Sequence, residues 1–339
     1  MLNILDNVSD HMLELEAKDL HTVLPGPTLI HLEGRKVDPV FVSVLLHGNE
    51  DTGWLAIRDL LKKYRDQTLP RSLSVFIGNV KAARFYERFM DGQPDFNRIW
   101  ADNEQNKDLP ERAMVRQVVA TMKARKVFAS IDIHNNTGLN PHYACVRVLE
   151  HNHLHLATLF GRTVVYFLTP REVQTEPFSQ LCPAVTVECG QPGQPHGVEH
   201  AREFVDAVLH LSEFPAHAIN ERDVDLFHTV AVAKVPETAS ISFGDSDSDI
   251  RFMEDLDHLN FRELPAGTTF GWVKPGSDAV ISVYNDQGQS VSKDYFKIED
   301  HELRTVRPVM PSMLTVSTTA IRKDCLCYLM ERIPFKDIA

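Results

Sequence analysis

The sequence predicts a layered α/β domain followed by a smaller, mainly β domain. Over the first part of the chain, short apolar and β-branched runs alternate with segments whose apolar residues have helical spacing. From Thr229 onward, short strand-like runs follow one another, separated by turns rich in Pro, Gly and Asp. At 339 residues the chain is also long for one domain. We therefore expect two domains, residues 1–215 and 216–339.

The expected elements follow one another in a regular order. Residues 1–22 have loosely spaced apolar side chains, which indicate an amphipathic helix. Apolar runs predict strands over 28–32, 40–46, 73–77, 127–133, 143–148, 164–167 and 184–187, with 34–36 as a turn. Helical spacing predicts helices over 54–64, 111–123 (opened by Pro110), 153–160 and 198–211. In the second domain we expect strands over 230–235, 268–273, 279–284 and 314–317, and an exposed loop over 243–249.

Composition excludes several classes of protein. The net charge of −12, from 35 basic and 47 acidic residues, argues against binding to nucleic acid. The absence of a long apolar run argues against a membrane span, and the acidic N-terminus is unlike a signal peptide. The five cysteines form no CxxC pair, so neither a disulfide framework nor a cysteine zinc site is indicated. We expect a cytoplasmic protein with a small-molecule partner, and a homo-oligomer remains open.

The first functional signal lies where the strand over 40–46 gives way to the helix over 54–64. His47 and Glu50 lie in the turn between them, which is where ligands bind in open α/β sheets. An imidazole and a carboxylate three residues apart can converge on one metal ion. The alternative is a helix N-cap, because Asn49, Glu50 and Asp51 are all favoured near a helix start.

Two further polar clusters follow predicted strands. His134 ends one strand and Glu188 ends another. Together with the first cluster they supply a His, a Glu and a second His from separate segments, which is the two-His, one-Glu set of catalytic zinc sites. Asp132 faces the same way as His134 and is placed to support it. The alternative for His134 is a strand end followed by the turn over 135–138.

A fourth cluster is the loop over 88–98, which contains two arginines together with amide side chains. An arginine can bind a carboxylate in bidentate fashion, or steady an oxyanion near a metal. The alternative is a surface loop in which Asp95 pairs with Arg98.

Together these motifs resemble the succinylglutamate desuccinylase/aspartoacylase family, which belongs with the zinc carboxypeptidase fold. The resemblance is carried, in the family's order, by HGNE at 47–50, DFNR at 95–98, DIHNNT at 132–137 and ECGQP at 188–192. It implies a layered α/β/α domain with a mixed sheet. It also implies one Zn2+ ion per chain, and it fades over the last 120 or so residues.

The resemblance also implies roles for individual residues. The implied metal ligands are His47, Glu50 and His134. The implied catalytic residues are Glu188, as the general base, and Arg88, as a group that polarises the carbonyl. The implied substrate-binding residues are Asn97 and Arg98, as a clamp for the α-carboxylate, and Tyr284, as the candidate for a closing tyrosine from the second domain.

The chain departs from the family pattern in two places. The segment over 92–94 lengthens the stretch between Arg88 and Asp95, so Arg84 is the alternative to Arg88. Aspartoacylases carry a substrate-binding arginine about ten residues before the catalytic glutamate. Here Phe178 occupies that region and Arg171 is the nearest arginine. The resemblance therefore does not imply specificity for N-acetylaspartate.

The activity implied is hydrolysis of the amide bond of an N-acyl amino acid by a metal-activated water. The alternatives are a metallocarboxypeptidase-type exopeptidase acting on short peptides, a zinc deacylase acting on another acylated amine, and a non-catalytic binding protein. For two weaker features we favour a structural role over a functional one. The alternating histidines over 151–155 indicate the start of a helix rather than a second metal site, and strand alternation turns Cys189 away from Glu188.

Overall fold

The computed structural model of the chain describes residues 2–104, 106–244 and 247–334. Contacts within this part divide the chain into two compact units. The first unit contains residues up to 135 and 142–225, and the second contains 136–141 and 226–334. The boundary therefore lies after Asp225, later than the position expected from the sequence.

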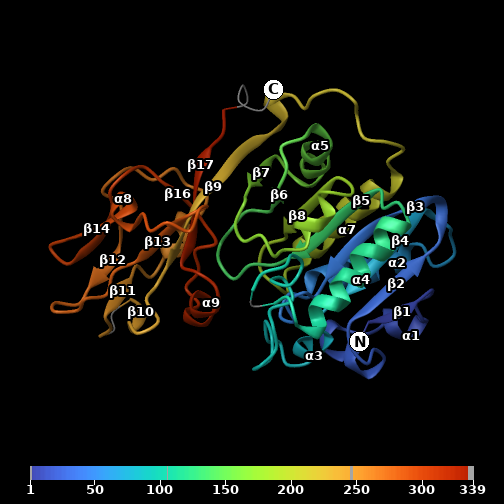
Figure 1. Ribbon diagram of the computed structural model, residues 1–339, viewed down its shortest axis with the longest axis horizontal. Coiled ribbons are helices and arrows are strands. Elements are labelled where there is room, and N and C mark those ends of the chain that lie inside the picture. The colour runs from blue at the N-terminus through green and yellow to red at the C-terminus, as the bar shows by residue number, and fades with distance from the viewer. Residues whose placement is uncertain (1, 105, 245–246, 335–339) are drawn as a thin grey trace. The chain divides into compact units, whose positions relative to one another are not determined.

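The first unit is built on a mixed β-sheet with the strand order β1-β2-β4-β3-β5-β8-β6-β7 (Figure 1). β3, β5 and β8 are parallel neighbours, while β2 and β6 run antiparallel to β4 and β8. The strands span Asn3–Leu5 (β1), Thr28–Leu32 (β2), Gly34–Val44 (β3), Leu69–Ile77 (β4), Ala129–His134 (β5), Tyr143–Val146 (β6), Thr163–Tyr166 (β7) and Ala184–Glu188 (β8). This arrangement confirms the predicted α/β class.

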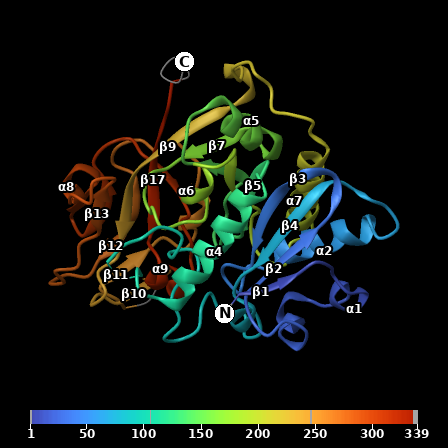
Figure 2. The same ribbon diagram turned by 45° about the vertical axis from the view of Figure 1, so that its right-hand side comes forward.

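Helices cover both faces of this sheet (Figure 2). On one face α2, α5 and α7 pack together, and on the other the core contains Phe41, Phe76 and Phe178 with the apolar side of α4. The rings of Phe41 and Phe178 stack 4.4 Å apart. The helices span Asp10–Leu13 (α1), Ala17–Thr22 (3-10), Thr52–Lys63 (α2), Val80–Ala83 (α3), Pro110–Ala124 (α4), His151–Phe160 (α5), Thr175–Phe178 (α6), Pro195–His210 (α7) and Glu221–Asp223 (3-10).

Two expectations for the first unit are wrong. Residues 1–22 do not form one helix, because Asn3–Leu5 pairs with β2 as an edge strand and only short helical turns follow. The side chain of Ser9 caps the first of these turns by accepting the Met12 N–H. Residues 34–36 are not a turn, since they open β3 and pair with β4. Local apolar spacing contains no information about either of these pairings.

The second unit consists of two sheets around a common apolar core that includes Phe252, Phe270, Val283 and Leu329. In one sheet β9 pairs with β13 and β17, and β17 pairs with β16; the other has the order β10-β11-β12-β15-β14. The strands span Asp225–Lys234 (β9), Ile241–Phe243 (β10), Ile250–Phe252 (β11), Thr269–Val273 (β12), Ser282–Asn285 (β13), Phe296–Glu299 (β14), Glu302–Thr305 (β15), Met310–Ser312 (β16) and Cys327–Arg332 (β17). Short helices span Leu256–Leu259 (3-10), Ser292–Tyr295 (α8) and Thr318–Lys323 (α9).

The strand expected over 314–317 is absent from the described structure. The side chain of Asn260 instead bonds both the N–H and the C=O of Leu314, at 2.9 and 2.8 Å, which replaces a strand partner. Ser317 then caps α9 by accepting the Ala320 N–H. Part of the loop expected over 243–249 lies outside the described residues, namely 245–246.

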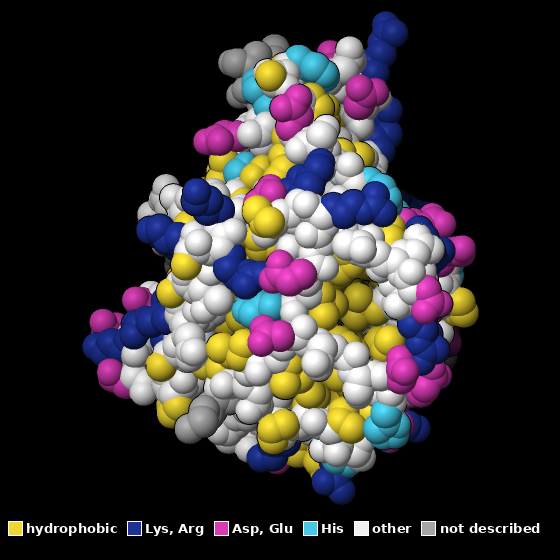
Figure 3. All heavy atoms as spheres, turned by 90° about the vertical axis from the view of Figure 1, so that its right-hand side faces the viewer, with side chains coloured by type: hydrophobic (Ala, Val, Ile, Leu, Met, Phe, Trp, Pro, Cys, Tyr) yellow, Lys and Arg dark blue, Asp and Glu magenta, His cyan; other side chains and the backbone are white. Residues whose placement is uncertain are grey.

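The distribution of surface charge and the character of the helices are relevant to two classes considered above, nucleic-acid-binding and membrane-spanning proteins. On the face of the molecule in Figure 3, basic and acidic side chains are interspersed, with hydrophobic ones between them. In the part of the chain that the structure describes, no helix has both the length and the apolar character needed to cross a membrane.

Three histidines of the first unit stack beside Phe160. The rings of His142 and His200 lie 5.0 Å apart, those of His142 and His196 lie 5.3 Å apart, and the Nδ1 atoms of His142 and His200 lie 2.7 Å apart. Burial lowers the pKa of His142 to about 4, and the neighbouring His200 and His196 shift it in the same direction. The fold therefore favours the neutral form of His142.

We predict that this preference makes the free energy of unfolding fall as the pH drops from 6.5 toward about 4. The unfolded chain binds a proton at this position over that window, whereas the folded chain excludes it. The variant His142→Asn should lose less stability over the same window. Urea unfolding of both proteins at several pH values measures the difference. An identical pH dependence in the two proteins would contradict the prediction.

Candidate metal centre

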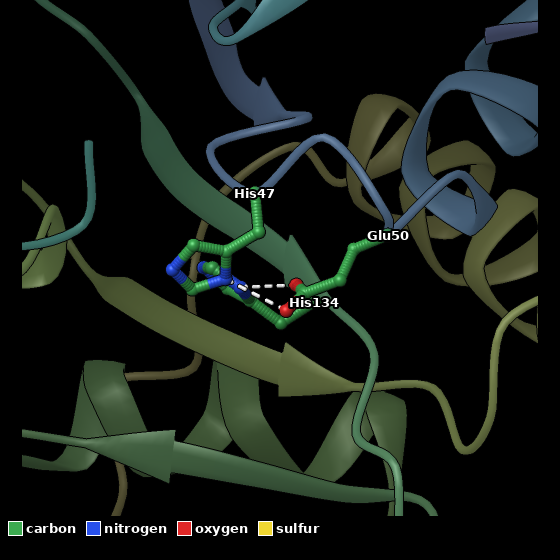
Figure 4. Close-up of side chains that lie close together, drawn as sticks. All are labelled: His47, Glu50 and His134. Atoms are coloured by element: carbon green, nitrogen blue, oxygen red, sulfur yellow. Dashed lines mark hydrogen bonds and ion pairs between the residues drawn. The ribbon is translucent and has the colours of Figure 1, made fainter. Parts of the chain in front are cut away.

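His47, Glu50 and His134 converge on one point in the first unit (Figure 4). One carboxylate oxygen of Glu50 lies 2.7 Å from His47 Nδ1, and the other lies 2.7 Å from His134 Nδ1. The three residues are 3, 6 and 3% exposed. Their candidate ligand atoms all lie within 4.8 Å of one another. The structure thus brings together the three residues predicted to bind a metal.

The parallel sheet explains this convergence. Because β3 and β5 are parallel neighbours, the loop after β3 and the last residue of β5 meet at the same edge. His47 and Glu50 lie in that loop, and the Glu50 N–H bonds the His47 carbonyl at 3.2 Å. A Cβ on Gly48 would lie 2.2 Å from the Ala83 nitrogen, so a larger residue would push the loop off α3.

The outer nitrogens of both imidazoles bind carboxylates. His134 Nε2 lies 2.9 Å from Asp132, and His47 Nε2 lies 3.1 Å from Asp95. Asp132 is itself fixed by the Ser43 hydroxyl, which donates at 2.6 Å. A histidine that donates its outer N–H to a carboxylate presents the lone pair of its other nitrogen to a metal. Both Nδ1 atoms are therefore oriented as ligands.

The donor set fits a metal ion. When both imidazoles donate their Nε2–H groups outward, two Nδ1 lone pairs face two carboxylate oxygens, so a positive charge is needed between them. Burial opposes charge on His134, but Asp132 and Glu50 hold its pKa well above the usual range. Burial also opposes charge on Glu50, but His47 and His134 lower its pKa. A bound metal can replace these protons, and its binding then releases them.

Glu188 lies beside this cluster at the same edge of the sheet. It ends β8, and its Cα is paired in register with that of His134. Burial raises the pKa of the neighbouring Cys189 thiol, and the charges of Glu188 and Glu50 raise it further. A thiol held protonated in this way is a poor nucleophile. The environment of Cys189 therefore disfavours a nucleophilic role.

The loop over 88–98 approaches the cluster through Asp95. The guanidinium of Arg88 binds Asp95 at 3.2 and 3.3 Å, and the Arg88 carbonyl accepts the Gly48 N–H. The alternative, Arg84, is exposed, and its guanidinium lies 5.2 Å from the centre of the Phe85 ring. Arg88 is therefore linked to the metal centre through Asp95 and Gly48.

The two residues predicted to bind the α-carboxylate occupy the end of the same loop. The amide of Asn97 lies 3.3 Å from His134 Nε2, and its backbone N–H donates to Asp95 at 2.7 Å. Arg98 donates to the Asn97 carbonyl at 2.9 Å. Asn97 thus lies against a ligand residue, with Arg98 next to it.

Three other residues considered in the sequence analysis lie elsewhere in the structure, namely Tyr284, Arg171 and His151. Tyr284 is on β13 of the second unit, and its proposed role stays a prediction. The side chain of Arg171 is 75% exposed and pairs with Glu176. His151 begins α5, as expected, and among the described residues no second group of three potential ligands accompanies it.

Asn135 is a site residue that the sequence analysis missed. Its N–H donates to Glu50 at 3.2 Å, and its side chain accepts the Thr52 N–H at the start of α2 and donates to the Gly190 carbonyl. It thereby joins β5, α2 and the segment after Glu188. The role of Asp95 on His47 was also missed. Asn135 lies in the motif at 132–137 and Asp95 in the motif at 95–98. Their places in these motifs were the only indication of their roles in the sequence.

A mixed sheet with a buried His–Glu–His cluster at the ends of its parallel strands is typical of metal-dependent hydrolases. The succinylglutamate desuccinylase/aspartoacylase catalytic domain matches residues 37–214, over half of the chain. The chain therefore belongs to this family of acyl-amino-acid hydrolases. Comparison with curated protein sequences gives no match.

Solved structures share the fold at low sequence identity. The chain resembles succinylglutamate desuccinylase from Chromobacterium violaceum with a TM-score of 0.60 and 16% identity, over 92% of this chain and 90% of that one. The corresponding values for murine aminoacylase 3 are 0.52, 16%, 88% and 96%. For a product-bound ectoine utilization protein from Ruegeria pomeroyi they are 0.55, 15%, 90% and 84%.

We predict that Asp132→Asn weakens the affinity for a divalent transition metal about 10- to 100-fold, because His134 loses the carboxylate that orients it. Competition with a metal-binding dye on the purified protein measures this. The matched control is Asp59→Asn, since Asp59 pairs with Arg58 at the surface. An unchanged affinity in Asp132→Asn would contradict the supporting role of this carboxylate.

Proposed function

We propose that the chain is a zinc-dependent hydrolase that cleaves the amide bond of an N-acyl amino acid. The observation that carries the proposal is the His47–Glu50–His134 cluster, with a carboxylate on the outer nitrogen of each histidine. Two histidines and one glutamate are the ligand set of catalytic zinc sites that keep a fourth position open. Membership in a family of acyl-amino-acid hydrolases supports the reaction type.

In this mechanism the three ligand residues hold zinc, and Glu188 moves the proton. A zinc ion held there would act as a Lewis acid, which polarises a carbonyl and makes water more acidic. Glu188 takes a proton from the attacking water, whose oxygen forms a bond to the amide carbonyl carbon. It then delivers that proton to the amide nitrogen as the C–N bond breaks. The products are a carboxylic acid and the free amino group of the amino acid.

The loop over 88–98 supplies the groups that bind the substrate. Arg88, held by Asp95, stabilises the negative charge that develops on the carbonyl oxygen. Asn97 and Arg98 bind the α-carboxylate, and a guanidinium suits this because it can donate two parallel hydrogen bonds. Anchoring the substrate at this group aligns its amide with the metal centre. We keep Tyr284 as a proposed substrate-binding residue.

The names of similar structures support the proposed substrate class. The similar structures are named as a succinylglutamate desuccinylase, an aminoacylase and an ectoine utilization protein. These names favour an N-acyl amino acid over the short peptides of an exopeptidase. Turnover of a panel of N-acyl amino acids and of dipeptides by the zinc-loaded protein separates the two activities. We also propose a cytoplasmic location, which fits the five free cysteines of the described structure.

The ligand assignment predicts that His47→Ala removes zinc. The wild type should contain about one zinc ion per chain, and the variant should contain little, because two ligands do not hold the ion against dialysis. Elemental analysis of both purified proteins measures the stoichiometry. The matched control is His155→Ala, since His155 lies on α5 outside the cluster. An unchanged stoichiometry in His47→Ala would remove the assignment.

The role of Glu188 predicts a different outcome. Glu188→Gln should retain zinc but lose turnover about 10²- to 10⁴-fold, because an amide cannot take up and deliver the proton. Cys189→Ala should retain turnover, which tests the adjacent thiol as a nucleophile. Steady-state kinetics and zinc content of both variants decide the matter. Retained turnover in Glu188→Gln would show that another group is the base.

A further inference from the structure

Asn79 and Gln93 form a reciprocal amide pair in the first unit. Asn79 Nδ2 donates to Gln93 Oε1 at 3.0 Å, and Gln93 Nε2 donates to Asn79 Oδ1 at 3.1 Å. Asn79 is buried and Gln93 is partly buried. Two hydrogen bonds between two planar groups fix both side chains more strictly than one bond does. The pair thus joins two segments of chain that are fourteen residues apart.

The Asn79 side of the pair is attached to the segment that leads into the metal centre. The Asn79 N–H bonds the carbonyl of Leu45 at 2.6 Å, two residues before His47. Its side-chain oxygen also caps α3 by accepting the Ala82 N–H at 3.1 Å. Asn79 is therefore fixed relative to the start of the ligand-bearing loop.

The Gln93 side of the pair is attached to the segment that ends at Asp95. The Met90 N–H donates to Gln93 Oε1, and the Gln93 N–H donates to the Met90 carbonyl, at 3.1 and 3.0 Å. These bonds close a turn in which Gly92 has a φ of +72°, a conformation that suits glycine. Only Pro94, whose φ is restricted, separates Gln93 from Asp95.

The position of Asp95 matters because its carboxylate serves several donors at once. It contacts His47 Nε2 at 3.1 Å and Arg88 at 3.2 Å, and it accepts the Asn97 N–H at 2.7 Å. Six residues separate Arg88 from Asp95 in the sequence. A loop of this length loses conformational freedom when it is ordered, so Asp95 needs a local constraint.

We propose that the Asn79–Gln93 pair is a positioning device for the metal centre. It holds Asp95 against His47 Nε2, and His47 then presents its Nδ1 lone pair to the metal. Asn79 and Gln93 are positioning residues, since their effect is transmitted through Asp95. The inference rests on the proposed function only in taking zinc as the ion.

A double-mutant cycle on zinc affinity tests this inference. The full chain is prepared as wild type, Gln93→Ala, Asp95→Asn and the double variant, and each competes with a chelating dye for zinc. We expect Gln93→Ala to weaken zinc binding about tenfold and Asp95→Asn about 10- to 100-fold. The double variant should bind no more weakly than Asp95→Asn alone, because the pair acts through that carboxylate. Independent, additive losses would overturn the proposal, as would an unchanged affinity in Gln93→Ala.

Two further variants separate positioning from general loosening. Gln93→Met keeps the length of the side chain but removes its hydrogen bonds, and it replaces Gln93→Ala in the cycle if that variant does not fold. The matched control is Gln289→Ala, because Gln289 forms an amide pair with Asn285 in the second unit, at 3.0 Å. Gln289→Ala should leave zinc affinity unchanged. A loss equal to that of Gln93→Ala would overturn the proposal.

The same measurements distinguish this inference from the proposed function. A zinc-loaded wild type that hydrolyses no N-acyl amino acid would contradict the proposed function, while the affinity cycle still decides the role of Gln93. A wild type that binds no zinc would contradict the metal centre and this inference with it.

Discussion

The rest of the site depends on the buried negative charge of Glu50. A carboxylate in this position is costly unless positive charge lies next to it. The two imidazoles supply that charge only while they are protonated, and each brings a second carboxylate, Asp95 or Asp132, into contact. With neutral imidazoles, the carboxylates of Glu50, Asp95 and Asp132 leave negative charge at this centre, which the guanidinium of Arg88, bound to Asp95, offsets only in part. A divalent cation between the Nδ1 atoms would offset more of it.

The sheet makes this charge arrangement rigid. β3, β5 and β8 are parallel neighbours, so the ligand-bearing loop, His134 and Glu188 lie at one edge without long connections. Within β5, Asp132 and His134 point to the same side, and this alternation places the supporting carboxylate behind the ligand. Asn135 then fixes the start of α2 against the edge, and its N–H binds Glu50. The register of the paired strands therefore determines the geometry of the site, and the packed core keeps that register fixed.

The sequence predicts the parts of this arrangement that local chemistry determines. Buried strands are recognisable by β-branched runs, and His47, Glu50, His134 and Glu188 stand out because polar residues follow such runs. Contacts between distant segments are not visible in this way. Asp95 meets His47 across 48 residues, whereas the only partner that the sequence suggested for Asp95 was the nearby Arg98. The same limitation explains the errors at 1–22, 34–36 and 314–317, where a partner elsewhere in the chain decides the local structure.

The low sequence identity of the similar structures is explained by the different demands that the apolar core and the metal centre place on their residues. A core that only needs apolar side chains of suitable volume tolerates extensive replacement, so 12–16% identity is compatible with a shared fold. The metal centre tolerates much less, because each donor must meet a particular atom at hydrogen-bonding distance. Short motifs at strand ends therefore carry the resemblance to the family. A carboxylate that lies on a loop, as Asp95 does, needs hydrogen bonds that fix its position, and in our proposal the Asn79–Gln93 pair provides them.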